Sequence, residues 1–159
     1  MIITAPERIP INSKLNYVFL AGTIDNGASE DWQERVCREI GGYNNLVILN
    51  PRKKNWNSSC EQKFENPEFF QQVSWEIDGL EKSNAIIFNF LPDSQSPITL
   101  MELGLFAPCN NLTTEERQKD IYVCCPDEFW RSGNVHFVCN KFNIPVFKDI
   151  SGLLFRFNG

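Results

Sequence analysis

Short apolar runs alternate with longer segments of helical periodicity along most of the chain, and this alternation limits the possible folds more than any other feature. Between the first two runs, Trp32, Val36 and Ile40 recur at helical spacing, as on one face of a helix. Strand–helix alternation predicts an α/β fold with a doubly wound parallel sheet, flavodoxin-like or Rossmann-like, covered by helices in three α/β/α layers. The runs predicted as strands span residues 17–22, 46–49, 85–91, 121–126 and 144–147.

Residues that favour helix starts and stops lie between these strands. Ser29 is expected to cap the first helix, and Gly41-Gly42 to end it. Asn66-Pro67 predicts the start of the second helix, because proline fits the first helical position. The third and fourth helices are expected over residues 97–107 and 135–142.

The length of 159 residues suits a single domain that spans residues 1–159. Residues 1–13 are expected to form a polar lead-in, and residues 108–119 a surface loop or a frayed helix extension. No apolar run approaches the ~18 residues of a membrane span, so no membrane partner is expected.

Cysteine and histidine usage argues against metal chemistry. None of the six cysteines forms a CxxC pair, and we expect buried free thiols in a reducing compartment. Residues 1–10 lack the pattern of a secretory signal, so a cytoplasmic location is expected. His136 is the single histidine, which argues against zinc and against a Ser/His/Asp triad, and we expect it to be structural. No metal or other cofactor is expected.

The charge distribution favours a small ligand over a polymer. The net charge is −5, and the densest cationic group is Arg52-Lys53-Lys54. A protein that grips a nucleic-acid backbone needs a larger basic surface, so no nucleic-acid partner is expected. A small molecule that enters a pocket is the better expectation.

Three segments are predicted to meet where parallel strands end, which is where such sheets bind ligands. They are Gly22-Thr23, the loop of residues 92–97 and the loop of residues 126–134. A glycine after a strand lets the backbone approach a ligand, and the Thr23 hydroxyl can bind sugar or phosphate oxygens. An ordinary strand-to-helix turn explains the same pair equally well.

Glu102 lies in an apolar helical segment that follows the third strand, between Met101 and Leu103. Such a carboxylate is expensive to desolvate, which suggests that a ligand arrives there. Ser96 is expected to cap this helix and to form an anion or sugar-oxygen site with its first N–H groups. Glu102 could attack a carbon as a carboxylate or protonate a leaving group as an acid. A structural glutamate that is satisfied by backbone donors is the alternative.

The preceding predicted helix carries two more acidic candidates, Glu76 and Asp78. Glu76 lies one helical position from the buried face, so it can line a pocket at the sheet edge; a solvated acidic face is the alternative. Trp56 and Trp75 are possible stacking surfaces for a flat ligand, and buried packing explains Trp75 at least as well. Carboxylates without other catalytic groups point to glycosyl transfer or hydrolysis through an oxocarbenium-like transition state.

Five segments in this order resemble the nucleoside 2-deoxyribosyltransferase-like proteins, from about residue 15 to residue 147. The most specific segment is the one that contains Met101-Glu102-Leu103-Gly104. The resemblance implies a flavodoxin-like fold and an enzyme that cleaves the N-glycosidic bond of 2′-deoxynucleosides. The segments are residues 17–24, 50–52, 73–76, 96–104 and 125–131.

The resemblance also implies roles for individual residues. Glu102 matches the nucleophile that attacks the anomeric carbon, and Glu76 matches the acidic residue that helps to protonate the base. Gly22, Thr23 and Asp78 are expected to bind substrate. In the family a short segment containing asparagine reaches the neighbouring subunit's site, and Asn134 is the candidate here. The resemblance therefore implies a homo-oligomer of two or more subunits.

One departure from the family pattern concerns the 5′ end of the substrate. The residue six positions before the nucleophile is aspartate in typical transferases and serine in the related 5′-monophosphate hydrolases; here it is Ser96. The hydrolases also place an arginine where this chain has Asp25, and a carboxylate disfavours a phosphate. The two observations conflict.

The expected function is transfer of the deoxyribosyl group from a 2′-deoxynucleoside to another nucleobase, through a covalent glycosyl-Glu102 intermediate. Hydrolysis of 2′-deoxynucleoside 5′-monophosphates is the first alternative. A non-catalytic nucleotide-binding module is the second, and a domain that binds no nucleoside is the third. The preferred base is left open.

Overall fold

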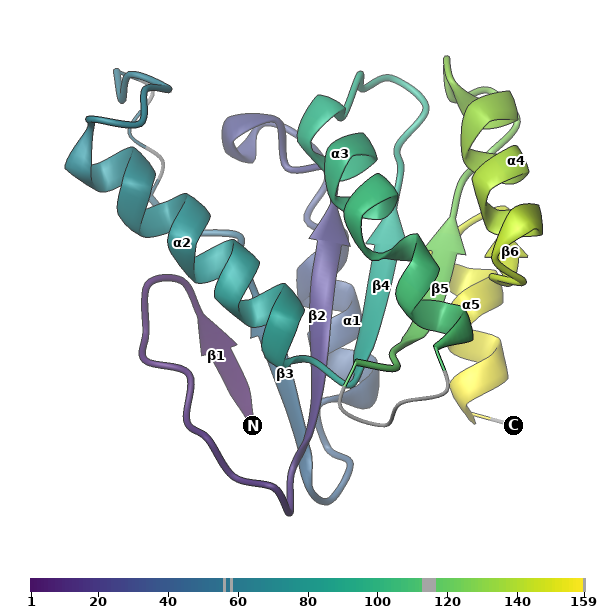
Figure 1. Cartoon of the computed structure of the whole chain (residues 1–159), viewed down its shortest axis with the longest axis horizontal. Coiled ribbons are helices and arrows are strands. Elements are labelled where there is room, and N and C mark those ends of the chain that lie inside the picture. The colour runs from purple at the N-terminus through teal and green to yellow at the C-terminus, as the bar shows by residue number, and fades with distance from the viewer. Residues whose placement is uncertain (56, 58, 113–116, 159) are drawn as a thin grey trace.

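The computed structural model describes residues 1–55, 57, 59–112 and 117–158. Within these residues, parallel strands form one sheet in the order β1-β3-β2-β4-β5-β6 (Figure 1). The strands are β1 (Ile2–Thr4), β2 (Asn16–Gly22), β3 (Leu46–Asn50), β4 (Ala85–Asn89), β5 (Asp120–Cys124) and β6 (Val146–Phe147). The α-helices are α1 (Trp32–Ile40), α2 (Pro67–Lys82), α3 (Pro97–Phe106), α4 (Ser132–Lys141) and α5 (Ile150–Asn158).

Helices cover both faces of this sheet. α2, α3 and α4 pack on one face, where Trp75, Leu103 and Val135 join the core around Phe19 (Figure 1). α1 and α5 cover the other face in a second apolar cluster. The predicted three-layer α/β/α arrangement is therefore confirmed. From β3 onward the strand order is that of flavodoxin-like folds, with β1 added at one edge.

The chain changes direction across the sheet between β2 and β4. From β2 it moves to β3 on one side, and it then returns over the sheet through α2 to β4 on the other side. The last paired residues of β2 and β4 are Gly22 and Asn89, and the N–H of Thr23 still donates to the carbonyl of Asn89 at 2.9 Å. Beyond this point the two loops separate, which opens the crevice where such sheets bind ligands.

Gly22 is required by packing at this point. A Cβ atom there would collide with the carbonyl oxygen of Asn89 and would lie 2.7 Å from the ring of Trp32. Trp32 is held in place by a 2.9 Å hydrogen bond from its indole N–H to the carbonyl of Thr23. The side chain of Thr23 therefore faces the crevice from a closely packed and well-defined backbone.

One strand and one α-helix were not predicted, and both lie near the chain ends. β1 falls within residues expected to form a polar lead-in; it pairs with β3 through Ile2–Thr4, and Ile3 is buried in the core. The prediction was wrong because a strand of three residues is too short to show a pattern. α5 was not predicted, and it packs against α1 through Leu153 and Leu154. The predicted last strand is shorter than expected, at Val146–Phe147.

One predicted helix cap was wrong, and a second lies where predicted but makes no capping bond. The cap of α1 is Asp31, whose carboxylate accepts from the N–H of Glu34 at 2.9 Å. Ser29 instead donates to the carbonyl of Ile24 at 3.0 Å. Ser96 stands at the cap position of α3, but its hydroxyl makes no capping bond, because it is engaged by other side chains. α4 begins at Ser132, before the predicted start, and the predicted cap and start of α2 are observed at Asn66 and Pro67.

The cysteines are unpaired in the structure, and all but the half-buried Cys60 are buried. Among the described residues, no group of side chains is placed to hold a metal ion. None of the helices in the described part of the chain has the length and apolar character needed to cross a membrane.

Candidate active site

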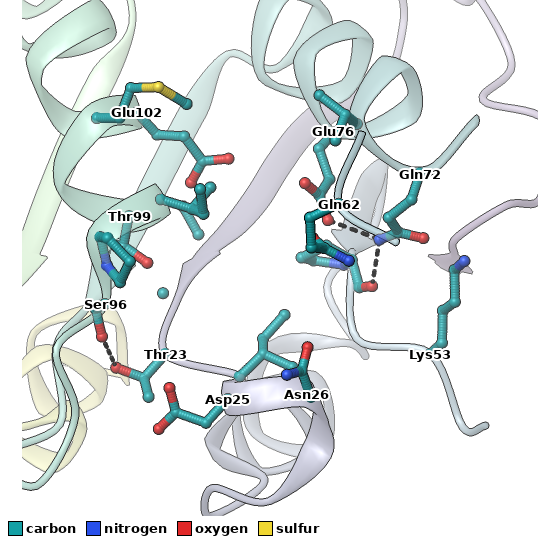
Figure 2. A pocket seen from close by; sticks show the side chains of 18 of the residues that line it. Thr23, Asp25, Asn26, Lys53, Gln62, Gln72, Glu76, Ser96, Thr99 and Glu102 are labelled. Carbon is teal, nitrogen blue, oxygen red and sulfur yellow. Dashed lines mark hydrogen bonds between the residues drawn. The ribbon is translucent and has the colours of Figure 1, made fainter. Parts of the chain in front are cut away.

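A cavity of about 410 Å³ opens in the crevice between α2 and α3, above the ends of β2 and β3 (Figure 2). Phe19 and Ala21 of β2 form part of its floor, and the two helices form its walls. Segments that are far apart in the sequence contribute polar side chains to it. The predicted site residues that line the cavity are Gly22, Thr23, Glu76, Ser96 and Glu102.

Glu102 lies in the second turn of α3, and its side chain points into the cavity (Figure 2). Only 6% of the residue is exposed. Within the described part of the chain, its carboxylate has no hydrogen-bond donor and no cationic partner. Burial, and then the negative charge of Glu76, raise the pKa of Glu102 from 4.5 to about 8. These surroundings therefore favour the protonated form of the Glu102 carboxyl at neutral pH.

Glu76 projects from α2 on the opposite wall (Figure 2). Its carboxylate accepts a 2.6 Å hydrogen bond from the side-chain amide of Gln72, which also donates to the carbonyl of Pro51 at 3.1 Å. Burial is the largest influence on Glu76 and leaves its pKa raised overall, although the Gln72 bond and the positive charge of Lys53 offset part of this rise. Unlike Glu102, Glu76 is supplied with groups that stabilise its ionised form.

The two carboxyl groups therefore face one another in unequal surroundings. Because each disfavours the charge of the other, the pair titrates as a unit and can hold one proton and one negative charge near neutral pH. Two carboxyl groups whose surroundings separate their protonation states can serve as one acid and one base or nucleophile. A positive charge that develops between them would be stabilised by the ionised member.

Three hydroxyl side chains at one end of the cavity are linked to one another and to a carboxylate, and we call this group the hydroxyl cluster: Thr23, Ser94, Ser96 and the carboxylate of Asp25. The hydroxyls of Thr23 and Ser96 are 2.6 Å apart, and those of Ser96 and Ser94 are 3.0 Å apart. The Ser94 hydroxyl donates to the carboxylate of Asp25 at 2.8 Å. The cluster joins the loop after β2 to the loop after β4, on the same side of the cavity as Glu102 (Figure 2).

Most of the chain, including the residues around this cavity, matches a known protein family. Residues 16–129 match the model of a family described as nucleoside 2-deoxyribosyltransferase like, and the match covers most of the chain. The chain belongs to this family. A search of curated proteins found no match. Every cavity residue named above lies within the segment that matches the nucleoside 2-deoxyribosyltransferase-like family.

Two residues that were predicted to bind substrate lie outside the cavity of this nucleoside 2-deoxyribosyltransferase-like protein. Asp78 is exposed on α2 and forms an ion pair with Lys82 at 3.2 Å. It is two positions after Glu76, which turns its side chain about 200° away around the helix. Asn134 is exposed in the first turn of α4.

The tryptophan and histidine predictions have different outcomes. Trp75 is buried beneath α2, where its indole N–H donates to the carbonyl of Glu7 at 2.7 Å, and it does not line the cavity. Trp56 lies outside the described residues. His136 is half-buried, and its Nε2 lies 3.2 Å from the carbonyl oxygen of Cys125, which fits the structural role expected for it.

Three residues that sequence reasoning missed contribute to the cavity or its polar network: Gln72, Lys53 and Ser94. Gln72 precedes Glu76 by one helical turn, so its position on the same face was a usable signal. Lys53 was noted only as part of a basic group. Nothing in the loop sequence shows that Ser94, and not Ser96, bonds to Asp25. The backbone at Ser96 is left-handed (φ 44°), which only the structure reveals.

Proposed function

We propose that the protein cleaves the N-glycosidic bond of 2′-deoxynucleosides and transfers the deoxyribosyl group to another nucleobase, with Glu102 as the nucleophile. The observation that carries this proposal is a buried carboxyl without a partner in the described structure, which faces a second carboxyl across a cavity large enough for a small molecule. The family assignment supports the same chemistry. No cofactor is included in the proposal.

In the first half of the reaction, the carboxylate oxygen of Glu102 forms a bond to C1′ of the sugar. The bond from C1′ to the base nitrogen breaks, and its electron pair stays on the base, which takes up a proton from Glu76. The step needs Glu102 ionised and Glu76 protonated, so the single proton that the pair shares must lie on Glu76 when Glu102 attacks, having moved from Glu102 once the nucleoside is bound. The electron-poor sugar carbon in the transition state is stabilised by the nearby negative charge.

In the second half, the nitrogen of another base attacks C1′ and releases Glu102, while Glu76 takes back a proton. Attack by water at this step would give hydrolysis, which is the second candidate function. In the described structure the cavity is open to solvent at one edge, where Asp25 and Asn26 are exposed. A nucleotide-binding module without turnover is the third candidate.

Product analysis separates these candidates. The protein is incubated with a 2′-deoxynucleoside, with and without a second nucleobase, and products are resolved by chromatography. The proposal predicts the exchanged nucleoside when the second base is present. Free deoxyribose at the same rate in both incubations would mean hydrolysis, and ligand-dependent melting without either product would mean a binding module.

Gln72 is proposed to orient the carboxyl of Glu76 and to stabilise the ionised form that Glu76 takes after it has given its proton to the departing base. Replacing it by methionine removes the 2.6 Å hydrogen bond and a factor that lowers the pKa of Glu76. We therefore expect the acidic limb of the kcat/KM profile to move to higher pH in Gln72→Met. The exposed neighbour Gln71→Met is the control. A lower melting temperature with an unshifted pH profile would mean that Gln72 has a structural role only.

We also propose that the protein is a homo-oligomer in which Asn134 reaches the site of a neighbouring subunit. Asn134 is exposed, and α3 presents an exposed apolar stripe of Ile98, Met101 and Leu105, of which the first two also line the cavity. Light scattering should give a mass of at least two chains. Mixing Asn134→Ala with Glu102→Gln should restore activity above that of either variant alone; a monomer, or no restoration, would contradict the proposal.

A further inference from the structure

Arg52 follows β3, and its side chain binds the loop that connects β2 to α1. Its Nη2 donates to the carbonyls of Gly27 and Ser29 at 2.9 and 2.7 Å. Its Nη1 donates to the carbonyl of Glu30 at 3.1 Å and to the Ser29 hydroxyl at 3.2 Å. Its Nε lies 3.4 Å from the carboxylate of Asp31, and the side chain is only 10% exposed. Each nitrogen of the guanidinium is therefore engaged by this loop.

The loop that Arg52 binds has a disfavoured backbone where it forms the edge of the cavity. Asp25, Asn26 and Gly27 are all left-handed, with φ of 48°, 54° and 85°. This conformation is costly for residues that carry a side chain, so it persists only where surrounding contacts stabilise it. Asp25 and Asn26 line the cavity, and the Arg52 bonds begin directly after them, at Gly27. Arg52 therefore stabilises the turn that forms this edge.

The two neighbours of Arg52 in the chain reach the wall of the cavity that α2 forms. The carbonyl of Pro51 accepts a 3.1 Å hydrogen bond from Gln72, and the same amide nitrogen donates to Glu76 at 2.6 Å. Lys53 lines the cavity beside Gln72 (Figure 2). Arg52 itself is not among the residues that line the cavity. Its backbone neighbours therefore approach Glu76, while its own side chain holds the loop after β2.

Secondary structure does not fix the position of residues 51–53. β3 ends at Asn50, and the described residues from there to the start of α2 at Pro67 form no helix or strand. The side chain of Asn50 accepts from the N–H of Arg52 at 2.9 Å, which directs the chain as it leaves the strand. The guanidinium of Arg52 then ties this segment to the loop after β2.

Arg52 is placed to influence Glu76 through position and not through its own charge. Burial is the main cause of the raised pKa of Glu76, and the Gln72 bond and the charge of Lys53 offset part of the rise. Arg52 is not among the charges that act on this pKa, and its own charge is compensated by Asp31. The other titratable groups that line the cavity are Asp25 in the loop after β2, Cys60 in the segment before α2, Glu68 on α2 itself and Glu102 on α3.

We propose that Arg52 is a positioning residue, whose guanidinium fixes residues 51–53 against the loop after β2 and thereby keeps a carbonyl acceptor and an ammonium group beside the Gln72–Glu76 pair. The placement rests on the contacts of the folded chain. Its consequence for the reaction rests on the proposed function, in which Glu76 exchanges a proton with the base. Without Arg52, the carboxyl of Glu76 is retained but loses part of the support for its orientation and its ionised form.

Carbon-13 NMR titration of the glutamate carboxyl groups tests the placement without relying on turnover, with the Glu76 signal assigned by its loss in Glu76→Gln. Arg52→Met keeps the apolar part of the side chain but removes the tether. We expect the pKa of Glu76 to rise, because groups that offset the effect of burial are displaced. Lys53→Met, which removes the ammonium group directly, should shift it in the same direction. Arg38→Met, at an exposed arginine on α1, is the control and should leave it unchanged.

Arg52→Lys separates position from charge. Lysine keeps the positive charge but lacks the planar fork that reaches several acceptors at once, so the pKa of Glu76 should rise here as well. The proposal is overturned if Arg52→Lys leaves this pKa unchanged, because charge alone would then be sufficient. It is also overturned if Arg52→Met lowers the melting temperature without moving this pKa, since Arg52 would then have a structural role only. If Arg52→Met does not fold, Arg52→Lys alone decides.

Base exchange provides the second measurement. Arg52→Met should slow exchange by about tenfold, which is less than the loss expected when a proton donor is removed altogether. A raised pKa of Glu76 in a protein that exchanges no base would support the placement and contradict the proposed function. Exchange by the unmodified protein, together with an unchanged pKa of Glu76 in both Arg52 variants, would support the proposed function and overturn the role of Arg52.

Discussion

Glu102→Gln is expected to lower the rate of base exchange by about a thousandfold or more, as when a covalent nucleophile is lost. Glutamine keeps the shape of the side chain but cannot form the ester to C1′ or stabilise the positive sugar carbon. Nucleoside binding should persist, because the cavity walls are unchanged. The measurement is kcat for base exchange, together with the dissociation constant of the nucleoside. Glu39→Gln, which alters an exposed glutamate on α1, is the matched control and should retain full activity.

The same variant should change how stability depends on pH. The pKa of Glu102 is raised from 4.5 to about 8, so between these values the folded chain keeps a proton that the unfolded chain has lost. The free energy of unfolding contributed by this group is therefore greatest below pH 4.5 and falls as the pH rises toward 8. Glu102→Gln lacks this loss, so it should gain stability relative to the unmodified protein as the pH rises. A pH-independent difference in urea denaturation would mean that Glu102 is not buried and unpaired in solution.

Glu76→Gln is expected to lower kcat by about a hundredfold to ten-thousandfold for natural nucleosides, because the departing base loses its proton donor. The loss should be much smaller for a substrate whose leaving group is stable as an anion, since that group needs no proton. Removing the Glu76 charge also removes one cause of the raised pKa of Glu102. Because Glu102 acts as the carboxylate, the remaining activity should rise with pH through this lowered pKa, and the fall in kcat/KM at alkaline pH should be lost with the proton donor.

The control for this prediction lies on the same helix. Asp78→Asn removes an exposed carboxylate that is paired with Lys82 outside the cavity, and it should leave kcat and the pH profile unchanged. Equal losses for good and poor leaving groups in Glu76→Gln would show that Glu76 binds or orients the substrate without donating a proton.

The layers of the fold could be predicted from the sequence because each buried element shows its own pattern. Residues 17–22 form a continuous apolar run, and the spacing of Trp32, Val36 and Ile40 marks a helix face that is buried as expected. β1 escaped prediction because its three residues are ordered by pairing with β3, which is distant in sequence. The cap of α1 is Asp31 and not Ser29, and the hydroxyl of Ser96 is turned from the end of α3 to other side chains; both depend on how the folded loops lie.

The site could be predicted in part for a similar reason. Glu102 and Glu76 could be identified because burying a carboxylate beside an apolar helix face costs free energy, which suggests a functional role. Both residues line the cavity. The similarity of Asp78 to Glu76 was misleading, because helix geometry sends them in different directions. The link from Ser94 to Asp25 joins two loops 69 residues apart, and only the three-dimensional arrangement reveals it.

The central claim is that Glu102 forms a covalent bond to the sugar, and trapping that bond tests it most directly. A 2′-fluoro-2′-deoxynucleoside should slow both steps by destabilising the positive sugar carbon, so the intermediate should accumulate when no second base is present. Intact-protein mass spectrometry should show the added fluorosugar, and peptide mapping should place it on Glu102, with loss of the adduct when a base is added. Base exchange without any adduct, or an adduct on another residue, would contradict the account.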